Sequence, residues 1–498
     1  MADKIKHLSK YLTPFNIFAA FCLIGFAGYL FIASRHGAAV TDYFMMENID
    51  LRFCDLIMHV EYVGDPQMLY VDRAIGWQGC FPPLSYLLYF LMSRLLTRDG
   101  VVPGVGVPID SANYLYCVIM YYSVAVAVLI LYGIQIYARE NTYNYHRFGV
   151  EDASGAPSYG EKSAQGLSQS RTENALRRGW LIFICLMISV PFYAGGMSVA
   201  NSTMLVMALL LIALKLRESE SPARREIALL LIAACAGFKI YPAIFGLFYL
   251  TEKRFKEAAR LTIYGIVLFF APFACFGGMN GLTHWLMNVK ETMGFMDYGR
   301  IQSIRGLLVT LARDHGMQES IPAAVYSLAP IVFLLIMLAL AAVSKNRYRR
   351  VFFLCAIMAF FPTNAYRYTL AYLAIPFIMY FMEDGRVATN ALSEDSKENS
   401  NANAECKKET GTTTAGPHHS ALSSRINTTF IYIETIMFSL VFAMPVVYAK
   451  IRGFRPSRDI YTYTQVERWL YFWAYLLMLL VTVHEVWALI RSRKLRQK

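Results

Sequence analysis

The stretch EIALLLIAACAGFKIYPAIFGLFYL, residues 226–250, decides how the chain is folded. It has the length and apolar composition of a membrane-crossing segment, which needs about 20 such residues. Basic residues stand at both of its ends, and the positive-inside rule places basic loops on the cytoplasmic side, so the segment cannot cross only once. Gly237, Lys239 and Pro242 lie inside it, and broken or re-entrant segments that line cavities use residues of this kind. We therefore expect residues 226–250 to enter the membrane and return.

The composition of the whole chain agrees with a membrane protein. Of its 498 residues, 56% are hydrophobic and only 16% are charged, whereas about a quarter of the residues in a soluble protein are charged. These values exclude disordered, collagen-like and disulfide-rich secreted chains. The formal charge of +12 arises in loops beside apolar runs, so we interpret it as a sign of membrane topology and expect no nucleic-acid partner.

Apolar runs elsewhere predict the remaining spans. The candidates are residues 15–34, 113–137, 179–195, 199–215, 258–277, 322–343, 351–361 with its continuation, 369–382, 428–449 and 466–490. A second dip is expected at 82–97, which Pro82 and Pro83 open. We therefore predict an all-α polytopic membrane protein with about ten to twelve transmembrane segments, some of them broken or re-entrant.

The distribution of basic residues predicts the orientation of these spans. The N-terminus and the tail are expected in the cytoplasm, together with the polar loops 139–178 and 384–427, which are interpreted as solvated linkers. Four segments then lie outside, namely 35–81, 278–321, 362–368 and 450–465. Cys54 and Cys80 both fall in the first of these, where a disulfide between them is possible but sequence alone does not decide it.

Ionisable residues near the bilayer are costly, so they are candidates for function. Asp55 lies in an apolar surrounding shortly after the first span, and His59 follows it by one helical turn, where it could orient the carboxylate. The alternative for Asp55 is an acid at the start of a helix on a solvated loop. Lys239 lies inside the first dip, where it either contacts an anion or extends its ammonium to the interface.

Arginines on the outer segments are candidates for binding phosphate, because a guanidinium donates paired hydrogen bonds to it. Arg305 lies beside Ser303 in the second outer segment, and Arg367 lies beside Tyr368 in the third. The alternative is a rim of charge that contacts lipid head groups. The sequence contains no nucleotide-binding motif, so we do not expect nucleotide-driven chemistry.

Five short motifs follow one another along residues 15–380. They are Asp55 with Gly64-Asp65-Pro66 and Phe81-Pro82-Pro83-Leu84, then Ala200-Asn201, Gly237-Phe238-Lys239-Ile240-Tyr241-Pro242, Gln302-Ser303-Ile304-Arg305-Gly306-Leu307-Leu308, and Pro362 to Tyr368. In this order they resemble glycosyltransferase family 87, a family of the C-type superfamily of membrane glycosyltransferases. The third motif also resembles the glycosylphosphatidylinositol mannosyltransferases. Two departures are Ala200, where the family has a glycine, and Arg367 with Tyr368, where many members have two histidines.

The resemblance implies a C-type glycosyltransferase fold and a polyprenyl-phosphate-sugar-dependent mannosyltransferase of the cell membrane. Such an enzyme moves mannose from the lipid donor to a glycan or glycolipid acceptor at the extracytoplasmic face. Residues 1–383 would form the membrane-embedded catalytic module, with outer catalytic loops at 35–81, 278–321 and 362–368. Residues 384–427 would then be a flexible cytoplasmic linker, and 428–498 would hold two accessory helices.

Within this family comparison, Asp55 is the expected general base of an inverting transfer. Other outer acids, Asp65, Asp72 and Asp297, leave the covalent alternative open. The expected substrate-binding residues are His59, Asn201, Lys239, Ser303, Arg305, Arg367 and Tyr368. No cofactor is expected, a divalent metal requirement stays open, and membrane lipids surround the protein. The competing hypothesis is a lipid-linked sugar flippase or transporter.

Overall fold

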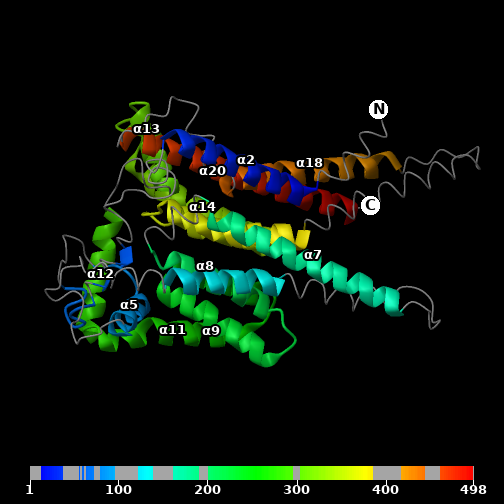
Figure 1. Ribbon diagram of the computed structural model, residues 1–498. Helices are drawn as coiled ribbons and strands as arrows, with labels where there is room; N and C mark the ends of the chain where they lie inside the picture. The colour runs from blue at the N-terminus through cyan, green and yellow to red at the C-terminus, as the bar shows by residue number, and fades with distance from the viewer. Residues whose placement is uncertain are drawn as a thin grey trace, which may run out of the picture.

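The computed structural model describes residues 13–36, 55–56, 59–60, 63–71, 79–95, 122–137, 161–189, 200–294, 303–384, 417–442 and 460–496. Over these residues the protein is helical and has no strand, which confirms the all-α prediction. Three of the described helices are long and apolar enough to cross a membrane, at Phe255–Cys275, Ala323–Val343 and Leu470–Arg493. Several shorter apolar helices pack beside them, and most of the helices run side by side (Figure 1).

Residues 226–250 form a helical hairpin. Helix α9 (Pro222–Phe238) ends where Lys239 takes an extended conformation, with φ −146° and ψ 128°. A 3-10 turn, η4 (Tyr241–Phe245), and the short helix α10 (Gly246–Thr251) then lead back along α9. Arg217, before α9, binds Glu252, after α10, with an N–O distance of 2.9 Å. Both ends of the hairpin therefore lie together, as a segment that enters and returns requires.

The tip of this hairpin is fixed by helix α5 (Pro83–Leu95). Ser85 donates a 2.8 Å hydrogen bond to the carbonyl oxygen of Phe238, and both groups are buried. A Cβ atom on Gly237 would stand 2.7 Å from Cδ2 of Leu84. The glycine therefore allows a close approach of the two helices, and a larger residue would force the Leu84 side chain to move.

Two parallel helices flank α9. Helix α8 (Thr203–Leu216) and helix α11 (Phe255–Phe270) are its main neighbours. Since α8 begins beside Asn201 and ends beside Arg217, it connects the two ends of the bundle. The end that contains Arg217, Glu252 and the start of α11 is called the basic end below, and the end that contains Asn201 and Lys239 is called the Asp55 end.

Helix α12 (Gly278–Gly294) lies across the helix ends at the Asp55 end, close to α5 (Figure 1). It follows α11 through the 3-10 turn η5 (Ala271–Cys275) and a tight turn in which Gly277 has φ +78°. Helix α13 (Ile304–Asp314) comes next and leads into α14 (Ala323–Val343). The outer segment predicted at 278–321 therefore contains two helices.

The core is formed around α15 (Arg347–Phe360), whose residues 351–360 each expose 1% or less of their surface. The chain then continues through η6 (Arg367–Leu373), α16 (Ala374–Met379) and the π-helical turn η7 (Tyr380–Asp384). The run predicted at 369–382 is therefore a broken helix. This region is buried because α8 and α15 pack against it on separate sides.

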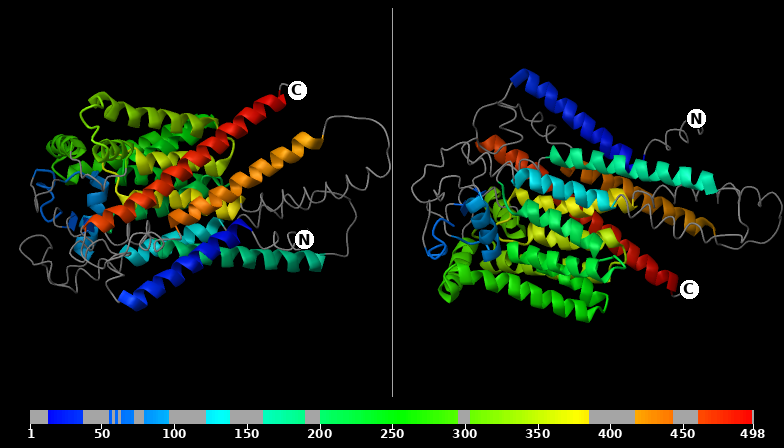
Figure 2. Two further views of the ribbon diagram at one scale, coloured as in Figure 1. Left: turned by 90° about the horizontal axis from the view of Figure 1, so that it is seen from above. Right: turned by 60° about the horizontal axis from the view of Figure 1, so that its bottom comes forward.

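The remaining helices are long and cover the core, as two further views show (Figure 2). They are α2 (Pro14–His36), the helix Tyr122–Tyr137, α7 (Glu161–Met187), α18 (Pro417–Phe442) and α20 (Ile460–Arg496). Three of these start well before the predicted spans, because α7 begins inside the expected linker 139–178, α18 begins inside 384–427, and α20 begins inside the outer segment 450–465. The first turns of these helices are polar, and the apolar part of each helix lies further along the chain. Hydropathy alone therefore places the start of the helix too late.

A buried polar network attaches the two last helices to the core. Arg349 of α15 binds Glu485 of α20 with an N–O distance of 3.0 Å, and its guanidinium also lies 2.8 Å from the ring nitrogens of His484. His484 in turn contacts Glu434 of α18 at 2.6 Å. All four side chains are buried, so each needs a partner for its charge or its hydrogen-bonding groups. The cluster thereby links the three helices α15, α18 and α20.

Candidate functional site

Asp55 and Asn201 form the centre of the candidate site. The side-chain amide nitrogen of Asn201 donates a 2.6 Å hydrogen bond to Oδ2 of Asp55. The amide oxygen of Asn201 accepts hydrogen bonds from the backbone nitrogen of Thr203 at 2.9 Å and from its hydroxyl at 2.6 Å. Because these two donors fix the amide, the nitrogen can point only toward the carboxylate. Asn201 therefore orients Asp55.

The backbone around Asn201 is also constrained. Ala200 has φ +52°, in the left-handed region that favours glycine. This explains why the motif resembled a glycine-containing one, since the turn before α8 requires this conformation. The hydroxyl of Tyr122 donates a 2.9 Å hydrogen bond to the carbonyl oxygen of Asn201 from the neighbouring helix. Tyr122 therefore holds the backbone of Asn201, and Thr203 holds its side chain.

Lys239 lies beside this pair, at the tip of the hairpin. Its ammonium stands 3.8 Å from the centre of the Phe81 ring and 5.8 Å from that of Tyr368, which brings three separate motifs into contact. Aromatic faces attract a cation in such positions. The Asp55 carboxylate is close enough to act electrostatically on this ammonium. The site therefore brings one carboxyl group and one cationic side chain together.

His59 lies in an aromatic box next to Lys239. Its ring centroid is 4.1 Å from that of Phe81, 5.2 Å from that of Tyr89 and 5.3 Å from that of Tyr86. Burial, together with the positive charge of Lys239, lowers the pKa of His59 to about 3. The imidazole is therefore neutral near pH 7, and the box fixes its position at the edge of the site.

Ser303 has a structural function at the start of α13. Its buried hydroxyl accepts a 3.0 Å hydrogen bond from the backbone nitrogen of Gly306 and donates a 3.1 Å bond to the carbonyl oxygen of Thr363. The serine thereby caps the helix and joins it to the turn that precedes Tyr368. These contacts favour a positioning role over contact with a substrate.

The structure describes the side chain of only one of the two candidate arginines. Arg305 lies in the first turn of α13, and its Nε is buried without a hydrogen-bond partner among the described residues. Arg367 begins η6, next to Tyr368, but its side chain lies outside the described part of the chain. Cys54 is also outside the described residues, and Cys80, the cysteine with which it could have paired, is free in the structure.

The side chains of α12 that hold the outer loop were not identified from the sequence. Asn288 donates hydrogen bonds to the carbonyl oxygens of Tyr70 and Gly79, at 2.8 and 2.9 Å, and Trp285 donates to that of Cys80 at 3.1 Å. Asn364 bridges the other side by donating to the carbonyl oxygen of Thr292 at 2.7 Å. A single asparagine on an outer segment carries no pattern that would have revealed this function.

The structure thus brings Asp55, Asn201, Lys239, His59 and Tyr368 to one end of the bundle. A carboxylate held by a neutral amide can accept a proton from a hydroxyl, and a neighbouring ammonium can stabilise an anion. The described residues contain no group of three or more His, Cys, Asp or Glu side chains that could hold a metal ion. The five side chains named above supply groups for proton transfer and anion binding.

Comparison with known proteins shows a match to a protein family. Residues 113–363, just over half of the chain, match the model of glycosyltransferase family 87. The matched region contains Asn201, Lys239, Ser303 and Arg305, whereas Asp55 precedes it and Tyr368 follows it. No curated protein matches the chain.

Proposed function

Because the chain belongs to glycosyltransferase family 87, we propose that it transfers mannose from a polyprenyl-phosphate donor to a glycan or glycolipid acceptor, with Asp55 as the general base. The family establishes a glycosyltransferase, and the apolar helices give it the character of a membrane protein. The sugar, the lipid donor and the catalytic residues belong to the proposal. The single observation that carries it is the hydrogen bond from Asn201 to Asp55, which orients one carboxylate beside one buried cation.

In this proposal the acceptor hydroxyl attacks the anomeric carbon of the donor sugar. Its proton passes to Asp55 as the new carbon–oxygen bond forms. The bond between the anomeric carbon and the phosphate oxygen breaks at the same time, so a polyprenyl phosphate leaves with the electron pair. A single displacement inverts the anomeric centre, and a β-linked mannosyl donor would yield an α-mannoside.

The departing phosphate needs positive charge close to it. Lys239 is suited to this because its ammonium is held between Phe81 and Tyr368 in a partly dehydrated place, where electrostatic attraction is stronger than in water. Arg305 and Arg367 are proposed to complete the phosphate site. The buried and unpartnered Nε of Arg305 supports its assignment, since a phosphate oxygen would supply the missing acceptor.

We further propose the C-type glycosyltransferase fold, with about ten to twelve transmembrane segments and the Asp55 end on the extracytoplasmic face of the cell membrane. The positions of the basic loops support this orientation. Arg217, Arg225 and Arg350 all lie at the end opposite to Asp55 and share the acidic partners Glu252 and Glu257. Under the positive-inside rule that end faces the cytoplasm.

Transfer by the purified full-length protein in detergent tests the function. The protein is incubated with radiolabelled polyprenyl-phosphate mannose and a lipid extract, and the products are separated by chromatography. We expect a new labelled glycolipid together with free polyprenyl phosphate. If the donor stays intact in detergent while proteoliposomes move it across their bilayer, the protein is a flippase and the proposal is wrong.

A further inference from the structure

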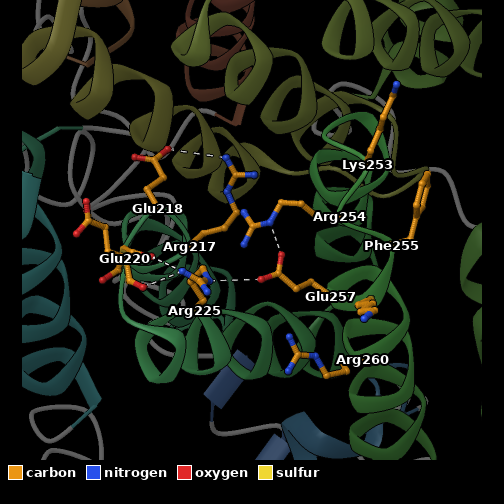
Figure 3. Close-up of a pocket in the computed structure, with 11 residues that line it drawn as sticks. Arg217, Glu218, Glu220, Arg225, Lys253, Arg254, Phe255, Glu257 and Arg260 are labelled. Atoms are coloured by element: carbon orange, nitrogen blue, oxygen red, sulfur yellow. Dashed lines mark hydrogen bonds and ion pairs between the residues drawn. The ribbon is translucent and has the colours of Figure 1, made fainter.

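A charged groove lies at the basic end of the bundle, opposite to Asp55. It has a volume of about 910 Å³ and lies between the loop that joins α8 to α9 and the loop that joins α10 to α11 (Figure 3). Three glutamates and six cationic side chains line it. The cations are Arg217, Arg225, Lys253, Arg254, Lys256 and Arg260. The groove therefore attracts anions, and none of these residues belongs to the site described above.

The glutamates hold the arginines in place. Glu257 binds Arg254 through a short ion pair and lies 3.5 Å from Arg225, and Figure 3 shows these three side chains pointing toward one another. Glu218 is engaged from outside the groove, because Arg347 binds it at 2.6 Å. Fixed guanidinium groups are well suited to bind phosphate, since little side-chain entropy remains to be lost.

One observation indicates that positive charge is left for a ligand. The charge of Arg217 is paired, because its guanidinium binds Glu252 at 2.9 Å. Lys253 and Lys256, in contrast, are exposed and have no ion-pair partner in the part of the chain that the structure describes. Glu218 and Glu257 are already engaged by arginines, so they do not neutralise these two lysines.

Lys253 occupies a position that a glycine would fill more easily. It has φ +59°, and the turn at the end of α10 closes when the backbone nitrogen of Arg254 donates to the carbonyl oxygen of Tyr249 at 2.8 Å. Left-handed residues after a helix are usually glycine. The chain instead carries a charged side chain at the edge of the groove, pointing away from the Arg–Glu cluster (Figure 3). Backbone strain at such a place is an indication of function.

In the proposed orientation, the groove lies at the cytoplasmic surface of the membrane. Phe255 lines it and is also the first residue of the apolar helix Phe255–Cys275. Its side chain is 62% exposed, and aromatic residues at the ends of spans lie among lipid head groups. We propose that the groove binds the phosphate of an anionic phospholipid head group, with Lys253 and Lys256 as its ligands and Phe255 against the upper part of the acyl chains.

The test measures lipid binding to the purified full-length protein in detergent by native mass spectrometry. The probe is dioleoyl phosphatidic acid, with dioleoyl phosphatidylcholine as the zwitterionic comparison and inorganic phosphate as the soluble competitor. The variants are Lys253→Gly, Lys256→Gln and both together. Lys253→Gly suits the left-handed backbone, so it removes the charge without harming the fold. Lys345→Gln is the matched control, because Lys345 is exposed at the same end but outside the groove.

We expect each groove variant to weaken phosphatidic acid binding about fivefold, and the double variant about 25-fold. The control should stay within about twofold, since its charge lies outside the site. An equal loss in Lys345→Gln, or no loss in the double variant, would overturn the proposal. Displacement of the lipid by inorganic phosphate at an equal concentration would overturn it as well, because the ligand would then be a soluble phosphate.

Discussion

The side-chain amide of Asn201 donates a 2.6 Å hydrogen bond to the carboxylate of Asp55, and Thr203 holds the opposite end of the same amide with two hydrogen bonds. The two partners come from distant parts of the sequence, the outer segment 35–81 and the turn before α8. Asp55 therefore depends on the start of α8 for its direction. Several predictions about the proposed transfer depend on this relationship and on its neighbour Lys239.

Loss of the amide should misplace the base. Asn201→Ala removes the donor to Asp55, and we expect kcat to fall about 100-fold with a much smaller change in the KM for the donor. Thr203→Ser keeps the hydroxyl that orients the amide and is the matched control, with kcat expected near the wild-type value. Steady-state transfer rates measure both variants. A wild-type kcat in Asn201→Ala would show that Asp55 needs no such support.

Lys239 should contribute to transfer through its positive charge. Lys239→Met removes the ammonium that lies between the rings of Phe81 and Tyr368, so stabilisation of the leaving phosphate should fall and kcat/KM for the donor should fall about 100-fold. Lys239→Arg keeps a cation at this position and is the matched control, with a smaller expected loss. Steady-state transfer rates measure both variants. Equal losses in the two variants would show that the charge of Lys239 is not what the reaction needs.

Ala200 should tolerate glycine but not valine. Its left-handed backbone favours glycine, which relieves strain of about 1 kcal/mol and offsets the loss of one buried methyl group. A β-branched residue at the same φ is a severe outlier. We therefore expect Ala200→Gly to unfold at a temperature close to that of the wild type and Ala200→Val to unfold at a clearly lower one. Thermal unfolding in detergent distinguishes them, and equal melting temperatures for the two variants would contradict this interpretation of the turn.

Loss of the buried cluster around Arg349, which joins the last two helices to the core, should lower the free energy of unfolding. Arg349→Met leaves Glu485 and Glu434 without their cation in a buried place, which costs about 3–5 kcal/mol in such networks. Arg347→Met, two residues earlier on the same helix, removes a partly exposed ion pair with Glu218 and a contact with the Tyr137 ring, and should cost about 1 kcal/mol. Denaturant unfolding in detergent measures both. Equal losses of unfolding free energy in the two variants would show that burial does not increase the contribution of the cluster to stability.

Much of the helical organisation could be predicted from the sequence, because apolar runs and basic loops follow from the bilayer itself. The hairpin at 226–250 is the best example, since the charges at its ends required both to lie on one side, and Arg217 binds Glu252 there. The helical starts of α7 and α18 could not be predicted in this way. Their first turns are polar, and polarity alone does not distinguish a helix that extends into solvent from a linker.

The candidate site was predictable as a set of residues but not as a set of contacts. Asp55, Asn201 and Lys239 were each marked by motifs or by an unusual environment, and the structure places them together. The hydroxyl of Ser303, in contrast, caps a helix and binds the Thr363 carbonyl, a function that depends on which backbone groups meet in three dimensions. The anchoring by Asn288 was missed for the same reason.

The most direct test of the proposed transfer is the single-turnover rate of Asp55→Asn with radiolabelled polyprenyl-phosphate mannose and excess purified enzyme. Asparagine keeps the shape of the side chain but cannot take the proton of the acceptor hydroxyl. We expect the rate to fall by about 10²–10⁴, while the affinity for the donor stays close to that of the wild type. A rate within a few-fold of the wild type would contradict the assignment of Asp55 as the general base, and with it the proposed mechanism.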